Sequence, residues 1–397
     1  MSTKDKVTLV PKLRFSEFVE SEGWVVEPFQ KLFTIGSGRD YKHLSKGCVP
    51  VYGSGGYMLS MDDFLYDGES VCIGRKGTIN NPMFLTGKFW TVDTLFYTHK
   101  FQQCLPKFIY AIFQNIDWLQ HNEAGGVPSL SKTIIEKIQT AVPGIPEQQK
   151  IADCLSSLDE LIAVQGCKVE ALKTHKKGLM QQLFPCKGET QPRLRFPEFQ
   201  TAGVWEERKL ATVCDIQRGK FSHRPRNDPR FFGGPYPFIQ TGDVVKSEGA
   251  GVVASQSLNE QGLAVSKLFK PPIVLITIAA NIGDTGLLLT EGCFTDSVVG
   301  LIPKKYVTPV FLELIMRGQK ENLNKVATTG AQKNINNEIL RKVSVLLPSV
   351  PEQQRIADCL SSLDALIAAA AQELETLKIH KKGLMQQLFP SPEAVEA

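Results

Sequence analysis

The stretch PEQQKIADCLSSLDELIAVQGCKVEALKTHKKGLMQQLFP, from Pro146 to Pro185, decides the architecture because the chain contains it twice. It returns as PEQQRIADCLSSLDALIAAAAQELETLKIHKKGLMQQLFP, from Pro351 to Pro390, with 30 of 40 positions identical at a constant offset of 205. The long stretches that precede the two copies barely resemble each other. We infer that one architectural element is used twice to present two different surfaces.

A matching frame extends the repeat on either side of these forty residues. PKLRFSEF at 11–18, followed by Trp24, returns at an offset of 181 as PRLRFPEF at 192–199, followed by Trp205. Directly before each long copy, GGVPSLSKTIIEKIQTAVP matches GAQKNINNEILRKVSVLLP. Between the frames, residues 40–124 and 220–329 share little beyond short predicted strands and glycine turns. The chain is therefore two half-molecules in tandem.

Each long copy reads as a helix with a narrow apolar stripe. Residues at alternating spacings of three and four are apolar at eight of ten positions in the first copy and nine of ten in the second. This pattern is typical of a coiled-coil seam. Pro146 and Pro351 suit a first helical turn, and the glutamate after each places a carboxylate at the positive end of the helix dipole. Pro185 and Pro390 are expected to end the helices.

The other copy is the obvious partner for each stripe. Antiparallel packing with matched ends places Lys176 near Leu363 rather than near Lys381, which avoids two buried like charges. The alternative is that each helix packs on its own domain as ordinary core, although such helices are usually shorter and have broader apolar faces.

The unlike inserts consist of β-branched or aromatic runs broken by glycine, followed by short helices. GSGGYM at 53–58 is interpreted as a hairpin. We predict an α+β fold in which two globular domains of mixed strands and helices are joined by two long antiparallel coiled-coil helices, with a pseudo-twofold internal repeat. The predicted divisions are a first domain over 1–145, a central helix over 146–185, a second domain over 186–350 and a distal helix over 351–397.

Composition bounds the class of protein. At 397 residues with 42% hydrophobic content, the chain can bury a core in each of two domains. MSTKDKVTLV has no apolar region after its charges, and no segment approaches about 18 uninterrupted apolar residues, so we expect neither a signal peptide nor a membrane span, and a cytoplasmic location. The nine cysteines, without a C-x-x-C pair, predict reduced and packed thiols rather than disulfides or zinc.

Catalytic signatures are missing from the sequence. It has no phosphate-binding loop, no H-E-x-x-H, no G-x-S-x-G and no strand followed by G-x-G-x-x-G that opens a helix. The six histidines are scattered without ligand spacing. We therefore expect no catalytic residue and no metal site in this chain.

Basic side chains cluster in the loops of both inserts. The net charge of +4 is mild, so its distribution matters more than its sum. IQRGKFSHRPRNDPR at 216–230 carries a local excess of positive charge over Asp215 and Asp228. Such loops suit duplex DNA, because Lys and Arg neutralise phosphates while Arg and Asn contact base edges. The alternatives are a solvated turn and, before the long helices, helix caps. The predicted DNA contacts are Arg39, Lys42, Lys46, Arg75, Lys76, Arg218, Lys220, Arg224, Arg226, Arg230, Lys333 and Asn334.

The order of P-x-L-R-F-x-E-F, a variable domain, PEQQ-[KR]-IADCLSSLD and a long helix, all repeated once, resembles the specificity subunit of Type I restriction-modification enzymes. The resemblance covers essentially the whole chain, and PEQQ-x-IA is its most specific part. It implies that each variable region is a target-recognition domain for one half of a split sequence in double-stranded DNA, and that the long helices separate the two readers.

The resemblance also implies partners and no active site in this chain. Two modification subunits are expected to bring S-adenosylmethionine and adenine methylation, and restriction subunits to bring ATP with magnesium, translocation and cleavage. No cofactor is expected in the chain itself. Residues that recur on the exposed helix faces suggest two identical docking surfaces for two copies of one partner. The predicted partner-binding residues are Asp153, Asp159, Asp358 and Asp364.

Two rival interpretations stay open at this point. The first is a coiled-coil interaction scaffold whose β-rich domains bind protein or carbohydrate, which steeply salt-dependent DNA binding would exclude. The second is an enzyme with an unfamiliar active site, for which the sequence shows no candidate pair of residues.

Overall fold

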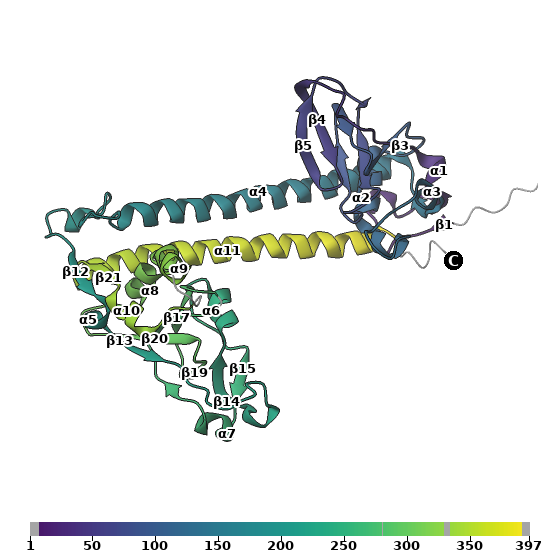
Figure 1. Ribbon diagram of the computed structural model, residues 1–397. Helices are drawn as coiled ribbons and strands as arrows, with labels where there is room; N and C mark the ends of the chain where they lie inside the picture. The colour runs from purple at the N-terminus through teal and green to yellow at the C-terminus, as the bar shows by residue number, and fades with distance from the viewer. Residues whose placement is uncertain (1–7, 280, 329–333, 391–397) are drawn as a thin grey trace, which may run out of the picture. The chain divides into compact units, whose positions relative to one another are not determined.

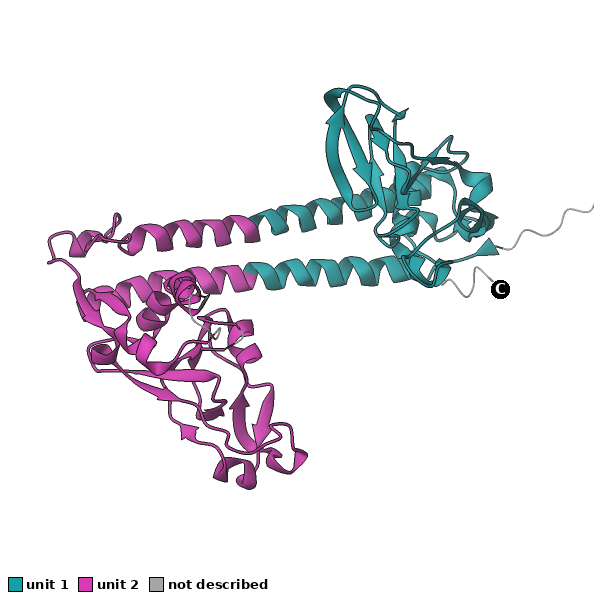
Figure 2. Ribbon diagram, in the orientation of Figure 1, with its two compact units in different colours: residues 1–168, 370–397 teal, residues 169–369 magenta. Residues whose placement is uncertain are grey.

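The computed structural model describes residues 8–279, 281–328 and 334–390. These residues fall into two compact units, coloured separately in Figure 2. Unit 1 comprises residues 1–168 and 370–397, and unit 2 comprises residues 169–369. Each unit is described by itself and holds one part of each long helix, whereas the sequence-based division treats each helix as a segment of its own.

Unit 1 is built from three small sheets, whose strand orders are β3-β10-β7-β8, β5-β4-β9-β6 and β1-β2-β11 (Figure 1). Its strands are β1 (Thr8–Leu9), β2 (Trp24–Pro28), β3 (Thr34–Ser37), β4 (Lys46–Gly53), β5 (Gly56–Met61), β6 (Tyr66–Asp67), β7 (Ser70–Gly74), β8 (Met83–Leu85), β9 (Lys88–Thr91), β10 (Leu95–His99) and β11 (Gln139–Val142). Its short helices are α1 (Phe29–Leu32), α2 (Pro106–Asn115) and α3 (Lys132–Lys137), with 3-10 turns at η1 (Ser16–Phe18) and η2 (Trp118–His121). The segment at 53–58 includes the β4–β5 turn, as predicted.

Unit 2 repeats this plan, with sheets ordered β13-β20-β17-β18, β15-β14-β19-β16 and β12-β21. Its strands are β12 (Glu206–Lys209), β13 (Cys214–Arg218), β14 (Phe232–Ile239), β15 (Gln256–Leu258), β16 (Leu268–Phe269), β17 (Ile273–Thr277), β18 (Thr285–Leu288), β19 (Gly292–Phe294), β20 (Val298–Pro303) and β21 (Ser344–Leu347). Its short helices are α5 (Leu210–Val213), α6 (Thr241–Ser247), α7 (Glu260–Ala264), α8 (Pro309–Gly318), α9 (Lys320–Thr328) and α10 (Asn337–Lys342), with 3-10 turns at η3 (Pro197–Phe199) and η4 (Pro229–Phe231).

The two long helices are α4 (Ile145–Leu183) and α11 (Val350–Leu388), each of 39 residues. Within each unit, a part of α4 runs antiparallel to a part of α11. In unit 2, Lys176 of α4 pairs with Asp364 of α11, beside Leu363, which confirms the predicted register. In unit 1, Lys381 of α11 pairs with Asp159 of α4 at 2.6 Å.

The helix ends also belong to the domain cores. In unit 1, Ile151 and Leu155 of α4 share a buried cluster with Leu388 of α11 and with Trp24 and Phe108 of the globular part. In unit 2, Leu183, Ile356 and Leu360 lie in the corresponding cluster with Trp205 and Phe311. The two alternatives from the sequence, packing of the long helices on each other and packing of each helix on a domain, therefore both occur. One part of each helix packs in the seam, and its end packs in the domain core.

A buried ion pair joins the start of each long helix to the motif P-x-L-R-F-x-E-F. In unit 1, Arg14 donates hydrogen bonds to both carboxylate oxygens of Glu147, at 2.8 and 2.7 Å, and Trp24 Nε1 donates a third at 3.1 Å. Hydrogen bonding to Glu147 raises the pKa of Arg14. The sequence predicted only a helix-dipole role for this glutamate. In the structure Glu147 also binds Arg14 and Trp24, and we call this group of three residues the anchor of the helix.

The same anchor occurs in unit 2. Arg195 donates to both oxygens of Glu352 at 2.7 Å, and Trp205 Nε1 donates at 3.3 Å. The following glutamine completes the joint in both units: Gln148 accepts from the amide of Leu105 at 2.8 Å, and Gln353 accepts from that of Thr308 at 3.0 Å. The sequence PEQQ therefore ties each long helix to the chain just before α2 or α8.

No helix within the described ranges is both long enough and apolar enough to span a bilayer.

Candidate nucleic-acid interface

In unit 1, several loops meet at one end of the sheet β3-β10-β7-β8. After β3, the amide of Arg39 donates to the carbonyl of Thr91 at 2.8 Å. After β7, the amide of Arg75 donates to the carbonyl of Thr94 at 2.8 Å, and its own carbonyl accepts from Leu130 at 2.9 Å. These bonds bring together segments that lie up to ninety residues apart in the sequence.

Glycine allows the first of these crossings. A Cβ on Gly38 would lie 1.9 Å from the carbonyl oxygen of Val92, and one on Gly219 in unit 2 would lie 2.1 Å from that of Thr295. No larger residue fits at either position without moving the backbone. The shared Gly-[Arg/Lys] pair at 38–39 and 219–220 thus has a physical cause.

Four of the five basic residues predicted in unit 1 belong to these converging loops. Arg39, Lys42, Arg75 and Lys76 are all exposed, and within the described residues none of the four forms an ion pair. The guanidinium of Arg75 lies 5.9 Å from the centre of the Phe96 ring, an arrangement that orients it without neutralising it.

Lys46 does not lie with the other four. It opens β4, whereas the cluster includes the turn at the far end of the same strand, after Gly53. Seven steps along a strand cover about 23 Å. Lys46 is therefore separated from the hairpin turn by most of the length of the sheet.

A cavity of about 830 Å³ opens among these loops. Its walls come from the loop after β3, the β4–β5 turn and the turn before β10. The lining residues are Asp40, Tyr41, Lys42, Gly53, Ser54, Gly55, Gly56, Tyr57, Met58, Val92, Asp93 and Thr94. Tyr57 and Met58 are exposed, so the cavity combines polar, charged and apolar side chains.

Unit 2 forms the same scaffold at the end of the sheet β13-β20-β17-β18. The amide of Lys220 donates to the carbonyl of Phe294 at 3.0 Å, that of Ile278 donates to Ser297 at 3.0 Å, and that of Ile335 donates to Ile278 at 3.0 Å. These three bonds match those of Arg39, Arg75 and Leu130. The two units thus share the same backbone hydrogen bonds at this end of the sheet, but the side chains at the equivalent positions differ.

Three predicted arginines of unit 2 converge on one aspartate. Arg226 donates to the Asp296 carboxylate at 2.6 and 2.7 Å, and Arg224 donates to it at 3.3 Å. Arg218 donates to the Asp296 backbone carbonyl. Asp296 lies in the turn between β19 and β20, about seventy residues away, so the local excess of charge in the 216–230 loop is partly balanced.

The other basic residues of this loop differ in their surroundings. Arg230 pairs with Asp228 at 2.7 Å, and hydrogen bonds from Arg230 lower the pKa of that carboxyl to about 2. Lys220 is exposed and has no ion pair within the described part of the chain. Lys220 and Arg230 both remain predicted DNA contacts. Lys220 has no ion pair among the described residues, whereas Arg230 is paired with Asp228.

The polar stretch before α11 is described only in part. Asn334 is exposed and forms a β-bridge with Ala279, as Ser129 does with Lys76 in unit 1. Lys333 lies outside the described residues. Nearby, Ser131 and Asn336 cap α3 and α10, so for this pair the cap interpretation is confirmed.

Sequence reasoning missed the acidic residue at the centre of each site. Asp93 and Asp296 precede the matching strands β10 and β20, and both sit on the turn whose carbonyls hold the neighbouring loops. The signal in the sequence is weak: TVDTL at 91–95 aligns with FTDSV at 294–298 at an offset of 203, and only the aspartate is identical. A single identity inside unlike inserts is hard to separate from chance without the bonds that define the alignment.

The predicted partner-binding residues fall into two groups. Asp159 and Asp364 pair with Lys381 and Lys176, with 42% and 50% of their side chains exposed. Asp153 and Asp358 are exposed on the outer helix faces, and the carboxylate of each accepts a hydrogen bond from the glutamine one turn earlier, at 2.8 Å. The first group thus has an internal role that the sequence did not predict.

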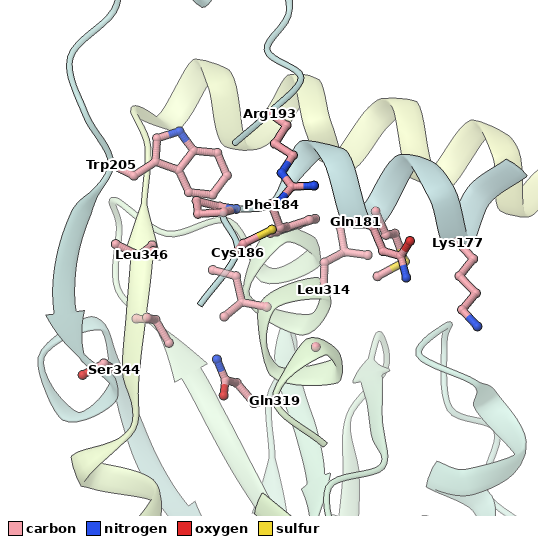
Figure 3. A pocket seen from close by; sticks show the side chains of 15 residues that line it. Lys177, Gln181, Phe184, Cys186, Arg193, Trp205, Leu314, Gln319, Ser344 and Leu346 are labelled. Carbon is pink, nitrogen blue, oxygen red and sulfur yellow. The ribbon is translucent and has the colours of Figure 1, made fainter. Parts of the chain in front are cut away.

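Unit 2 holds another cavity, of about 660 Å³, beside the end of α4 (Figure 3). Phe184, Trp205 and Leu314 line it, together with Lys177 and Arg193. It includes none of the predicted DNA contacts.

The family described as "Type I restriction modification DNA specificity domain" matches residues 21–174 and 202–378. The chain belongs to this family. The two matched ranges correspond to the two halves of the internal repeat.

Specificity subunits are found among curated relatives of the chain. The specificity subunit of the type I restriction enzyme MjaVIII from Methanocaldococcus jannaschii is 27% identical over 348 residues, which cover 82% of this chain and 77% of the relative. A putative type I restriction enzyme specificity subunit of Haemophilus influenzae is 21% identical over 333 residues, with 83% of each chain covered.

Solved structures share the fold of this family member. The S subunit of a type I restriction-modification system from M. genitalium aligns with a TM-score of 0.66 at 14% identity, covering 96% of this chain and all of that one. A chain from a study of complex assembly in the type I R-M system aligns with a TM-score of 0.58 at 19% identity, covering 93% and 98%. At these identities the likeness supports the fold alone.

Proposed function

We propose that this chain is the DNA-reading subunit of a type I restriction-modification enzyme, and that each unit reads one half of a bipartite DNA target. One observation carries the proposal: the same three backbone bonds build the same sheet end in both units, while the side chains on it differ. A shared scaffold with unlike surfaces suits two readers that recognise two unlike half-sites.

The exposed cations supply the general attraction to DNA. The loop cluster of unit 1 has four basic residues and two acidic ones: Arg39, Lys42, Arg75 and Lys76, with Asp40 and Asp93. The loop cluster of unit 2 has five basic residues and two acidic ones: Arg218, Lys220, Arg224, Arg226 and Arg230, with Asp228 and Asp296. Both loop clusters thus carry a positive excess, which favours phosphate contacts. The arginines held by Asp296 are oriented in advance, which lowers the entropy cost of placing them on DNA.

The chemistry is assigned to partners. We propose two modification subunits that bind S-adenosylmethionine and methylate adenine, and restriction subunits that use ATP with magnesium to translocate and cleave. The curated relatives are named as specificity subunits, that is, as components of a larger enzyme. The duplicated outer faces around Asp153 and Asp358 are proposed to dock the two modification subunits.

The long helices are proposed to set the separation of the half-sites. Each has 39 residues, or about 58 Å at the rise of an α-helix. Inserting one heptad into both helices should lengthen the gap between half-sites while leaving the half-sites unchanged. An unaltered gap would contradict this part of the proposal.

Methylation mapping tests the proposal directly. The chain is expressed with the modification subunit of its own system, and methylated adenines are mapped in the host DNA. A bipartite motif that disappears without this chain is the expected result. Alanine variants of Arg39 and Arg75 should alter one half of the motif, and variants of Lys220 and Arg226 the other. Methylation that does not depend on this chain would overturn the assignment.

A further inference from the structure

Asp93 and Asp296 occupy equivalent positions in the two units but have opposite surroundings. Each precedes the strand that pairs with the Gly-[Arg/Lys] loop, and the next residue holds an amide from the loop after β7 or β17. Asp296 is held by Arg224 and Arg226. The carboxylate of Asp93, within the residues that the structure describes, has no hydrogen bond and no ion pair.

The free carboxylate lies inside a surface that is otherwise suited to a polyanion. Asp93 is exposed and lines the 830 Å³ cavity together with Lys42 and Tyr57. An ionised aspartate is only an acceptor of hydrogen bonds. Facing phosphates, it would repel them, because both groups are negatively charged. A carboxylate at this place therefore opposes general DNA binding and requires another use.

Two such uses can be compared. A bound cation would need further ligands, but across the described residues no group of three or more His, Cys, Asp or Glu side chains is placed to hold a metal ion. Duplex DNA itself offers hydrogen-bond donors at base edges: the N4 amino group of cytosine and the N6 amino group of adenine point into the major groove. An acceptor without an internal partner matches these groups.

We propose that Asp93 is a specificity-determining residue of unit 1, which accepts a hydrogen bond from the exocyclic amino group of a cytosine or an adenine in the major groove. This inference rests on the proposed DNA-reading function. Unit 2 does not read a base through Asp296, because that carboxylate is already engaged by arginines. The equivalent position thus reads DNA in one half and orients basic side chains in the other.

The test uses the full chain in complex with its modification subunit. After the wild-type motif has been mapped, duplexes are made in which single bases of each half-site lack only the amino group, with purine for adenine and 2-pyrimidinone for cytosine. Binding is measured for wild type, Asp93→Ala and Asp296→Ala. A matched control is Glu69→Ala, which removes an exposed carboxylate at the opposite end of β7 from Arg75.

At one position of one half-site, removing the amino group should weaken binding of the wild-type complex by roughly ten-fold. Asp93→Ala should lose this discrimination there and keep it elsewhere, while Glu69→Ala and Asp296→Ala retain it. The identity of the sensitive base distinguishes cytosine from adenine. Because the readout is binding, it applies even where a variant no longer supports methylation, and thermal melting of the isolated variants checks their fold.

Retention of every base preference by Asp93→Ala would overturn the inference while leaving a bipartite motif and the proposed function intact. A wild-type complex that shows no motif dependent on this chain would instead overturn the proposed function. The two failures are therefore distinguishable.

Discussion

Gln165 of α4 donates a hydrogen bond of 3.0 Å to the backbone carbonyl of Ala370 of α11. Ala370 is the residue that corresponds to Gln165 in the second copy of the repeat. The same amide donates to Glu373 at 2.7 Å, and only 8% of Gln165 is exposed. Gln165 is thus a polar residue in the antiparallel seam, at the point where equivalent residues of the two helices meet. A polar residue in such a seam specifies the register of the helices at a cost in stability.

Replacing Gln165 with Leu should raise the free energy of unfolding by about 1 kcal/mol, because the seam gains apolar contact and the Ala370 carbonyl keeps its bond within the helix. Urea denaturation of the purified chain measures the change. Gln386→Leu, at an exposed position of α11, is the control and should change stability little. A clear loss of stability in Gln165→Leu would show that the amide bonds outweigh the packing.

The ion pair between Lys381 and Asp159 should contribute measurably to stability. The Lys381 side chain is 10% exposed, and Gln114 accepts a further bond from its ammonium at 2.9 Å. Asp159→Asn leaves this ammonium with weaker partners and should cost about 1 to 2 kcal/mol, less than a fully buried pair because Asp159 itself is half-exposed. Lys381→Met should cost less, since it removes the buried charge.

Denaturation of both variants beside Glu160→Gln, an exposed neighbour of Asp159, separates the pair from general charge effects. Equal losses in the three variants would argue against a specific role for the pair.

The salt dependence of DNA binding should reveal which basic residues of unit 1 contact phosphates. Lys42→Gln with Lys76→Gln should reduce the slope of log K against log salt by about 2, near 0.9 for each lost contact, without changing the methylation motif. Lys46→Gln should leave the slope unchanged, because Lys46 lies at the other end of β4. A slope that responds only to Lys46→Gln would place the DNA on the opposite end of the sheet.

The outer helix faces should matter for partner association and not for folding. Asp153→Arg with Asp358→Arg should weaken co-purification of the modification subunit several-fold, because both proposed docking faces change sign. The melting temperature of the chain alone should stay within a few degrees, since both residues are exposed. Glu20→Arg with Glu321→Arg, two exposed positions off the long helices, controls for net charge, and normal co-purification of the first variant would contradict the docking surface.

The repeated parts of the fold could be predicted from the sequence because local rules determine them. A sustained apolar stripe, a proline in the first turn and the avoidance of facing lysines were enough to find α4 and α11 and to place Lys176 beside Leu363. The anchor was harder to find: Glu147 reads as an ordinary residue at a helix start, and only the fold shows that Arg14 and Trp24 converge on it.

The candidate site could be predicted only in its local part. Runs of arginine are visible in the 216–230 loop, but their partner Asp296 is brought in by strand pairing across some seventy residues. The sequence likewise does not show that Lys46 opens β4, at the opposite end of that strand from the turn that lines the cavity together with Lys42. Contacts between distant segments decided which charges are free.

The anchor at each helix start closes a loop in the chain. Arg14 and Trp24 stand before the variable stretch of unit 1 and Glu147 stands after it, while β2 and β11, its entry and exit strands, pair side by side. Arg195, Trp205 and Glu352, with β12 and β21, do the same in unit 2. The two ends of each variable stretch thus meet at one buried ion pair and one pair of strands, so we expect that the residues between them can be replaced without any adjustment of the long helix.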